Sequence, residues 1–134
     1  MKDLKFFGGL DVNFLYQLLK QRPKCERISH KKMPSYSEHY WFVASMPYKE
    51  WWTIAYKGVS CGSIYLSEVN EIGVHLLKEF HHKGIEAAAI RWMASRHKNK
   101  RLICNVGIND KSRKYIMDMI PGWRKVQVTY ALRG

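Results

Sequence analysis

The hydrophobic patterning of the chain predicts a single α/β or α+β domain. A length of 134 residues suits one domain, because a chain of this size buries roughly two-thirds of its unfolded surface. Hydrophobic residues make up 46% and charged residues 25%, which is typical of globular proteins rather than disordered or fibrous ones. Helical and strand-like periods alternate with no repeat and no long linker. We therefore expect residues 1–134 to fold as one unit.

The N-terminal quarter contains a strand pattern and a helix pattern. Leu4–Phe7 predicts a short strand that ends at a glycine pair. The apolar residues that follow have helical spacing, with Asp11 or Asn13 as the N-cap and Pro23 as the end of the helix. Residues 24–32 are basic and unpatterned, which favours a solvated loop over a dedicated phosphate-binding loop.

A second helix and a hairpin come next. Ser35 and Glu38 have the spacing of a capping box, which predicts a short helix that ends at Pro47. From Trp51 the hydrophobic period changes to two. Residues 51–56 and 61–69 therefore predict a β-hairpin, joined by a Lys-Gly turn.

The C-terminal half predicts strand, loop, helix, strand, helix, strand. In residues 71–77 the two faces of the first strand are Ile72, Val74 and Leu76 on one side, and Glu71, Gly73, His75 and Leu77 on the other. Gly73 indicates a bulge in this strand. Residues 84–93 predict a helix with an apolar stripe, which a cationic run follows.

The last three predicted elements follow the same logic. Residues 102–106 alternate as a strand, and Asn109–Ser112 begins a helix. The expected buried side of that helix consists of Tyr115, Ile116, Met119 and Ile120. Residues 123–133 alternate again and predict a long final strand.

The chain is strongly basic, with 23 Lys and Arg residues, 11 Asp and Glu residues and a formal net charge of +12. The excess lies in both halves and favours an anionic partner such as phosphate, nucleic acid or a membrane surface. No stretch approaches the roughly 18 apolar residues of a membrane span, and no signal-peptide pattern opens the chain. The three cysteines, Cys25, Cys61 and Cys104, fit neither a disulfide framework nor a zinc site. We expect a soluble cytoplasmic protein without a metal or a membrane partner.

Residues 71–93 carry the most informative pattern, a strand and a short polar loop that leads through Gly84 into a helix. Backbone N–H groups at a helix N-terminus bind anions, and Lys83 would add an opposite charge. The pattern indicates an anion-binding turn. A strand–loop–helix connection that binds nothing is the alternative.

Three motifs occur in a characteristic order: His81-His82-Lys83-Gly84-Ile85-Glu86 before a helix, Asn109-Asp110-Lys111-Ser112 before the next helix, and then Gly122-Trp123. Together with the preceding strand, they resemble the GNAT superfamily of acyl-CoA-dependent N-acetyltransferases over residues 35–133. The family's loop is Arg/Gln-x-x-Gly-x-Gly/Ala, of which Gly84 matches strictly. The helix at 35–42, with His39 and Trp41, resembles the acceptor-side helix of members that act on small amines and amino sugars.

The resemblance implies an α/β (α+β) domain with a mixed central β-sheet flanked by helices, in which the fourth and fifth strands, 71–77 and 101–107, splay apart. It also implies acetyl-CoA as the co-substrate, with the thioester in the splay and backbone N–H groups on its oxyanion. The loop amides from His82 to Ala87 would hold the pyrophosphate. The implied cofactor-binding residues are Val74, Leu76, His81, His82, Lys83, Gly84, Ile85, Glu86, Ala87 and Asn109.

Two positions depart from the family pattern. Glu86 stands where the family has Gly or Ala, and its carboxylate would repel a pyrophosphate unless the side chain turns outward along the helix. The family's frequent general acid, a tyrosine seven residues after the asparagine, falls here on Ile116. Tyr115 lies one position earlier, about 100° away around the helix, and is the candidate for protonating the thiolate.

A general base must take a proton from the acceptor amine. Glu71 and His75 share one face of the predicted strand, and Glu68 ends the preceding strand, so each is a candidate base if that face lines the acceptor cleft. A structural, hydrogen-bonded histidine is the alternative for His75 and also for His39.

We therefore predict an N-acetyltransferase that transfers an acetyl group from acetyl-CoA to a primary amine by direct attack. The expected acceptor is a small molecule such as an amino sugar, a nucleotide-linked amine or a modified nucleobase. The short chain predicts a shallow acceptor site, or one completed by a second subunit of a homodimer. One alternative is a catalytically silent relative that binds nucleic acid or protein through its basic surface. Another is an enzyme that acetylates an amino-modified base in nucleic acid.

Overall fold

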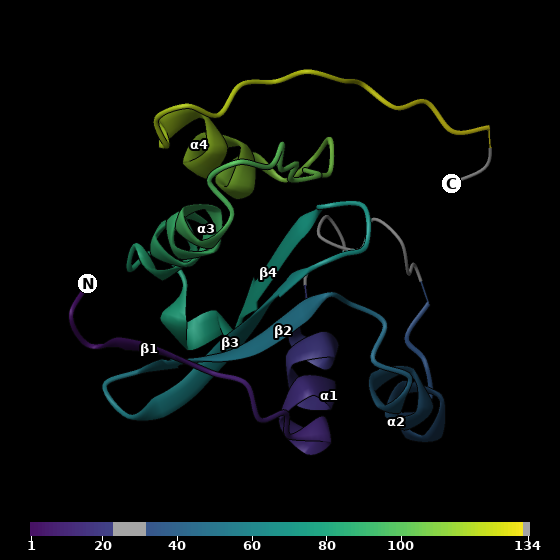
Figure 1. The fold of residues 1–134 in the computed structure, drawn as a ribbon. Coiled ribbons are helices and arrows are strands. Elements are labelled where there is room, and N and C mark those ends of the chain that lie inside the picture. Colours follow the sequence, from purple (N-terminus) through teal and green to yellow (C-terminus); the bar gives the residue numbers. More distant parts are fainter. Residues whose placement is uncertain (23–31, 133–134) are drawn as a thin grey trace.

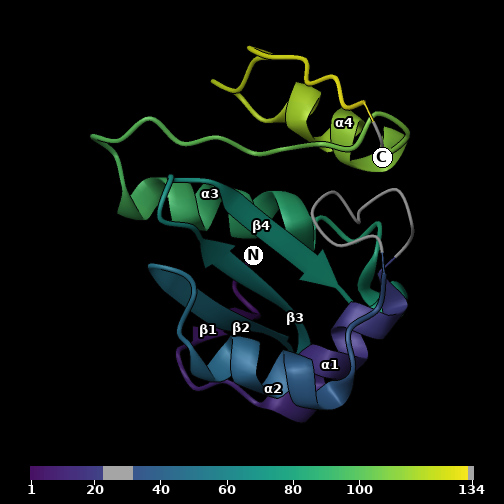
Figure 2. The same ribbon diagram turned by 90° about the vertical axis from the view of Figure 1, so that its right-hand side faces the viewer.

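Four antiparallel strands form a sheet in the order β1-β2-β3-β4. The computed structural model describes residues 1–22 and 32–132. Its elements are β1 (Leu4–Phe7), α1 (Val12–Gln21), α2 (Tyr36–Ala44), β2 (Glu50–Tyr56), β3 (Val59–Leu66), β4 (Ile72–Leu76), the 3₁₀ turn η2 (Lys78–Phe80), α3 (Ile85–Arg96) and α4 (Lys111–Met119). Helix α3 covers one face of the sheet, and α1 and α2 cover the other (Figures 1 and 2). The predicted α+β class, a sheet flanked by helices, is confirmed.

Side chains near the start of α1 and α2 fix where these helices begin. Asp11 caps α1, and its Oδ1 accepts the Phe14 N–H at 3.2 Å. Ser35 and Glu38 form the predicted capping box, in which each side chain accepts the other residue's backbone N–H. Two of the orphan donors of α2 are satisfied in this way, so the short helix has a defined start.

The apolar core lies between the sheet and α3. Val74 pairs with Ile64 and Ile72 pairs with Leu66 across β3 and β4, so these side chains share one face. Among the fully buried residues that pack there are Ile54, Ile64, Leu66, Ile72, Val74, Ile85, Ala89, Ile90 and Met93. The small Ala89 lets α3 approach the sheet closely. The predicted stripe is confirmed at Ile85, Ala89 and Met93, but Ile90 is also buried, whereas Ala88 and Trp92 are only half-buried.

Gly73 holds no bulge, contrary to the prediction. The irregularity in the sheet lies between Ile54 and Ala55, and the pairing of Gly73 with Tyr65 is regular. A Cβ atom built on Gly73 would overlap the Tyr65 ring. Glycine is therefore needed at this position because the Tyr65 ring of the neighbouring strand occupies the space of a side chain.

The two predicted strands at 102–106 and 123–133 do not form within the described residues. The first is reduced to one parallel bridge between Glu71 and Ile103. Residues 123–132 pair with no strand, and Tyr130 and Leu132 are exposed (Figure 1). An alternating pattern supplies strand propensity only, whereas a strand also needs an edge with which to pair.

The buried side of α4 also differs from the predicted stripe. Ile116 and Ile120 pack on the core, but Tyr115 and Met119 are exposed. Arg113 is buried in their place. None of the helices in the described part of the chain has the length and apolar character to cross a membrane. The predicted loop at 24–32, with Cys25, lies outside the described residues except for Lys32.

Candidate functional site

The outer edge of β4 is open beyond its first residue. Ile72 N donates to Ile103 O at 2.8 Å and Ile103 N donates to Asn70 O at 3.0 Å, and this parallel bridge is the only strand pairing on this edge in residues 1–22 and 32–132. On the opposite edge, Leu77 N donates to Cys61 O. Because hydrogen-bonding directions alternate along a strand, Val74 and Leu76 present their backbone groups to the open side, as Ile72 does. These are the two residues of the strand that the family resemblance places beside the cofactor.

Arg113 bridges this open edge. Its Nη2 donates to Val74 O at 2.6 Å and to Glu86 Oε1 at 2.9 Å. The side chains of Arg113 and Glu86 are 6% and 15% exposed, so they form an ion pair that is largely removed from water. Asp110, the N-cap of α4, accepts the Arg113 N–H and fixes where this residue lies on the helix. The Glu86 carboxylate is therefore neutralised by Arg113, a residue that apolar periodicity could not identify.

The turn before α3 leaves several backbone donors without a helical acceptor. His82 and Gly84 have positive φ values of 62° and 80°, and no side chain caps the helix among the described residues. The first intrahelical bond runs from Ala88 N to Gly84 O. The N–H groups of Ile85, Glu86 and Ala87 therefore stand at the positive end of the α3 dipole, as the sequence predicted for an anion-binding turn.

The other predicted cofactor residues are placed as follows. The His81 Nε2 donates to Leu76 O at 3.0 Å, so this ring covers the end of β4. Lys83 and Asn109 are exposed, and Ile85 is fully buried in the core. Ile85 can therefore contribute only its backbone N–H to a ligand.

Two of the three predicted base candidates, Glu71 and His75, lie on the same sheet face, as expected, and the third, Glu68, is exposed after the end of β3. His75 is 7% exposed. Burial, followed by the positive charges of Arg22 and Arg113, lowers the pKa of His75 well below 6.5, so the ring is neutral at pH 7. The Glu71 Oε2 accepts the Asn105 Nδ2–H at 2.6 Å and is partly exposed.

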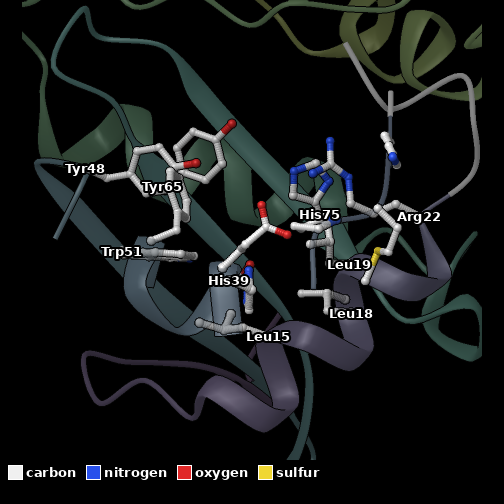
Figure 3. Close-up of a pocket in the computed structure, with 15 residues that line it drawn as sticks. Leu15, Leu18, Leu19, Arg22, His39, Tyr48, Trp51, Tyr65 and His75 are labelled. Atoms are coloured by element: carbon white, nitrogen blue, oxygen red, sulfur yellow. The ribbon is translucent and has the colours of Figure 1, made fainter. Parts of the chain in front are cut away.

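His75 faces a cavity of about 460 Å³ between the sheet, α1 and α2 (Figure 3). The volume is in the range of small-molecule sites. The lining residues are Leu15, Leu18, Leu19, Arg22, Lys32, Met33, Pro34, Glu38, His39, Phe42, Tyr48, Trp51, Ser63, Tyr65 and His75. The cavity thus lies on the side of the sheet opposite α3, and Glu71 is not among the described residues that line it.

Two tyrosines of the cavity lining were missed by the sequence analysis. The rings of Tyr48 and Tyr65 are stacked, with centroids 3.8 Å apart and an interplanar angle of 5°. Burial raises the pKa of both hydroxyls, so both are neutral at pH 7. The period-two pattern of β3 places Tyr65 on the His75 face, which was the available signal. Tyr48 lies in a loop, where no pattern identifies it.

His39 and Tyr115 have different surroundings. His39 is 7% exposed, and burial lowers its pKa. Its Nε2 has no hydrogen-bond partner among the described residues, and neither does the indole N–H of Trp51. Both residues line the cavity.

Tyr115, the predicted acid, is 67% exposed on α4.

Known proteins match this chain in three-dimensional structure but not in sequence. No model of a protein family matches the chain, and no curated protein sequence matches it. Solved structures do match it over most of their length, and three of them illustrate the result. An acetyltransferase from Thermus thermophilus has a TM-score of 0.72 and 14% identity, over 92% of this chain and 88% of that one.

The other two are acetyltransferases of named specificity. A ribosomal L7/L12 alpha-N-protein acetyltransferase in complex with coenzyme A has a TM-score of 0.66 and 16% identity, over 88% of this chain and 78% of that one. A spermidine N-acetyltransferase from Vibrio cholerae has a TM-score of 0.65 and 15% identity, over 90% and 80%. The chain therefore has the fold of the GNAT N-acetyltransferases.

Proposed function

We propose that this protein is an N-acetyltransferase that transfers an acetyl group from acetyl-CoA to the primary amine of a small molecule. One observation carries the proposal. Along β4, Val74 presents its backbone to the open edge, and the next residue, His75, presents its side chain to the cavity. Val74 is thus positioned to contact a thioester at the open edge, and the adjacent His75 is positioned to contact an amine in the cavity.

The groups along the open edge suit an acyl-CoA. The N–H groups of Val74 and Leu76 are donors for the pantetheine arm or for a developing oxyanion. The N–H groups of residues 85–87 and the Lys83 ammonium suit the diphosphate. The Glu86 carboxylate does not oppose this, because Arg113 neutralises it. That a structure of this fold was solved with coenzyme A supports the same assignment.

The chemistry is direct transfer, in which the amine nitrogen forms a bond to the acetyl carbon and the carbon–sulfur bond breaks. The neutral His75 ring is the proposed base that accepts the amine proton. Glu71 is the second candidate, because its carboxylate lies on the same sheet face. The departing thiolate needs a proton, for which Tyr115 was the sequence candidate. Tyr65, whose ring lies over Gly73 beside His75, is the better-placed hydroxyl.

Calorimetry with acetyl-CoA tests the first half of the proposal, and two variants at Gly84 locate the binding. Asparagine tolerates the left-handed conformation that Gly84 adopts, whereas a β-branched residue does not. We expect Gly84→Asn to keep CoA binding and Gly84→Val to weaken it strongly. Release of free thiol with a panel of amines then tests transfer. A protein that binds no CoA would contradict the proposal.

One observation favours a second candidate, a basic binding module without catalytic activity. Arg113 already occupies the Val74 carbonyl that a pantetheine amide would use. A silent relative would bind nucleic acid, with an affinity that falls steeply with salt, and would show no CoA affinity. Titration of a fluorescent oligonucleotide at two salt concentrations distinguishes the two functions.

A further inference from the structure

The cavity beside His75 has two chemically different ends. Figure 3 shows Tyr48, Tyr65 and Trp51 together at one end, and Arg22 beside His75 at the other. The aromatic end is fixed, because Tyr48 stacks on Tyr65 and meets Trp51 edge to face with centroids 4.8 Å apart. Such a wall suits a flat apolar group.

The opposite end is positively charged. The charge of Arg22 contributes to the lowered pKa of His75 and opposes the effect of burial on the pKa of Tyr48 and Tyr65. The positive charge of the Arg22 guanidinium therefore reaches the part of the cavity that His75, Tyr48 and Tyr65 line. Lys32 is the second cation of the lining.

The only carboxylate among the described lining residues belongs to Glu38. It is exposed, and its Oε1 already accepts the Ser35 N–H at 2.9 Å. The Glu71 carboxylate also acts on Tyr48 and Tyr65, but it lies outside the lining and accepts a hydrogen bond from Asn105. Two lining cations against one engaged lining carboxylate disfavour a ligand that carries several positive charges. The buried Nε2 of His39 and the indole N–H of Trp51, both without a described partner, add polar capacity that a ligand can satisfy.

We infer that the acceptor is a primary amine whose amino group lies next to a carboxylate or phosphate-type anion and whose body is a flat ring. The anion lies at Arg22, the amine at His75 and the ring against Tyr48, Tyr65 and Trp51. Polycationic amines are excluded. This inference rests on the proposed function, since it names the acceptor of that reaction.

The test compares matched probes by calorimetry in the absence of acetyl-CoA. The probes are phenylalanine, its aminophosphonate analogue, phenethylamine, alanine and spermidine. Phenethylamine lacks only the anion of phenylalanine, and alanine lacks only its ring. We expect the better of the two anionic ring probes to bind at least about tenfold more tightly than phenethylamine, which corresponds to one charged hydrogen bond. Alanine and spermidine should bind more weakly still.

The relative affinities of the carboxylate and the phosphonate identify the anion. Equal or tighter binding of phenethylamine or spermidine would overturn the inference, and so would the absence of binding by both anionic ring probes. Acetyl-CoA binding is measured separately. If the protein binds CoA but none of these probes, only the acceptor inference is contradicted. If it binds the probes but not CoA, the proposed function is contradicted instead.

A charge-matched pair of variants locates the anion. Arg22→Gln should remove the preference for phenylalanine over phenethylamine. Arg22 is the C-cap of α1. Lys20→Gln removes one charge from an exposed position of α1 that does not line the cavity, and this variant should keep the preference. A preference that survives Arg22→Gln would place the anion elsewhere and contradict the proposed orientation.

Discussion

Arg113 joins Glu86 to the open edge of the sheet. Its Nη2 lies 2.9 Å from Glu86 Oε1 and 2.6 Å from the Val74 carbonyl oxygen. Helices α3 and α4 are thus tied to β4 at the edge where the segment at 102–106 meets the sheet in one isolated bridge. Because both side chains are mostly buried, removal of one partner leaves the other charged group without compensation.

Single substitutions of this pair should therefore destabilise the protein, and the double substitution should recover much of the loss. We expect Glu86→Ala and Arg113→Met each to lower the free energy of unfolding by about 3 kcal/mol. The double variant should lose clearly less than the sum, because it leaves no unpaired charge. Urea denaturation of the four proteins measures this. Additive losses would mean that the two side chains are not energetically coupled.

Removal of the Glu86 charge should strengthen binding of a diphosphate, because it frees the Arg113 charge. Glu86→Gln keeps the shape of the side chain but leaves the Arg113 charge unneutralised beside the α3 N-terminus, so we expect CoA to bind several-fold more tightly, as measured by calorimetry. Glu79→Gln, at an exposed acid in η2, is the control that changes net charge equally. If both variants change CoA affinity by the same amount, the effect is one of overall charge and not of position.

Gly73 should not tolerate even alanine while Tyr65 is present. The added Cβ would overlap the tyrosine ring, and forced overpacking costs about 1–3 kcal/mol. In a Tyr65→Leu background the same Gly73→Ala change should cost less, because the planar ring is gone. The free energies of unfolding of the four proteins, compared in a double-mutant cycle, check this. An equal cost in both backgrounds would contradict the contact.

Stability should fall in mild acid because of the buried histidines. Burial, then Arg22 and Arg113, lowers the pKa of His75 well below 6.5, and burial lowers the pKa of His39. Each neutral ring contributes stability in full above pH 6.5, and this contribution is lost as the pH falls and the unfolded chain takes up the proton. Each fully responding group contributes about 1.4 kcal/mol per pH unit.

Urea denaturation at pH 7.5 and pH 5.5 measures this dependence. His75→Gln should show a smaller loss between the two pH values than the wild type, whereas His82→Gln, at an exposed position, should match the wild type. An unchanged loss in His75→Gln would show that this ring does not resist protonation.

Much of the fold could be predicted because local signals and tertiary structure agree. The capping box at Ser35 and the period-two runs that became β2, β3 and β4 are examples. The segment at 102–106 shows the limit, since its pattern is that of a strand, but only Ile103 meets an edge. On α4, the ion pair of Arg113 with Glu86 decided which side is buried, and hydrophobic periodicity contains no information about such a pair.

The candidate site was predicted in part for a related reason. The anion-binding turn before Ala88 could be predicted from a continuous strand–loop–helix pattern, whereas Val74 and Leu76 were assigned through the family resemblance. The cavity combines α1, α2, the loop at Tyr48 and the strands, which are distant in sequence. Only the three-dimensional structure shows that Arg22 and Tyr48 line opposite ends of the same cavity, with His75 beside Arg22.

The most direct test of the whole account is to follow the backbone amide signals of the ¹⁵N-labelled protein during titration with coenzyme A. We predict that the amides of Val74, Leu76 and residues 85–87 shift together and saturate, while those of Phe6 on the far strand do not move. If coenzyme A leaves the β4 and α3 amides unchanged, or shifts a different surface, this edge is not a cofactor site and the acetyltransferase proposal fails.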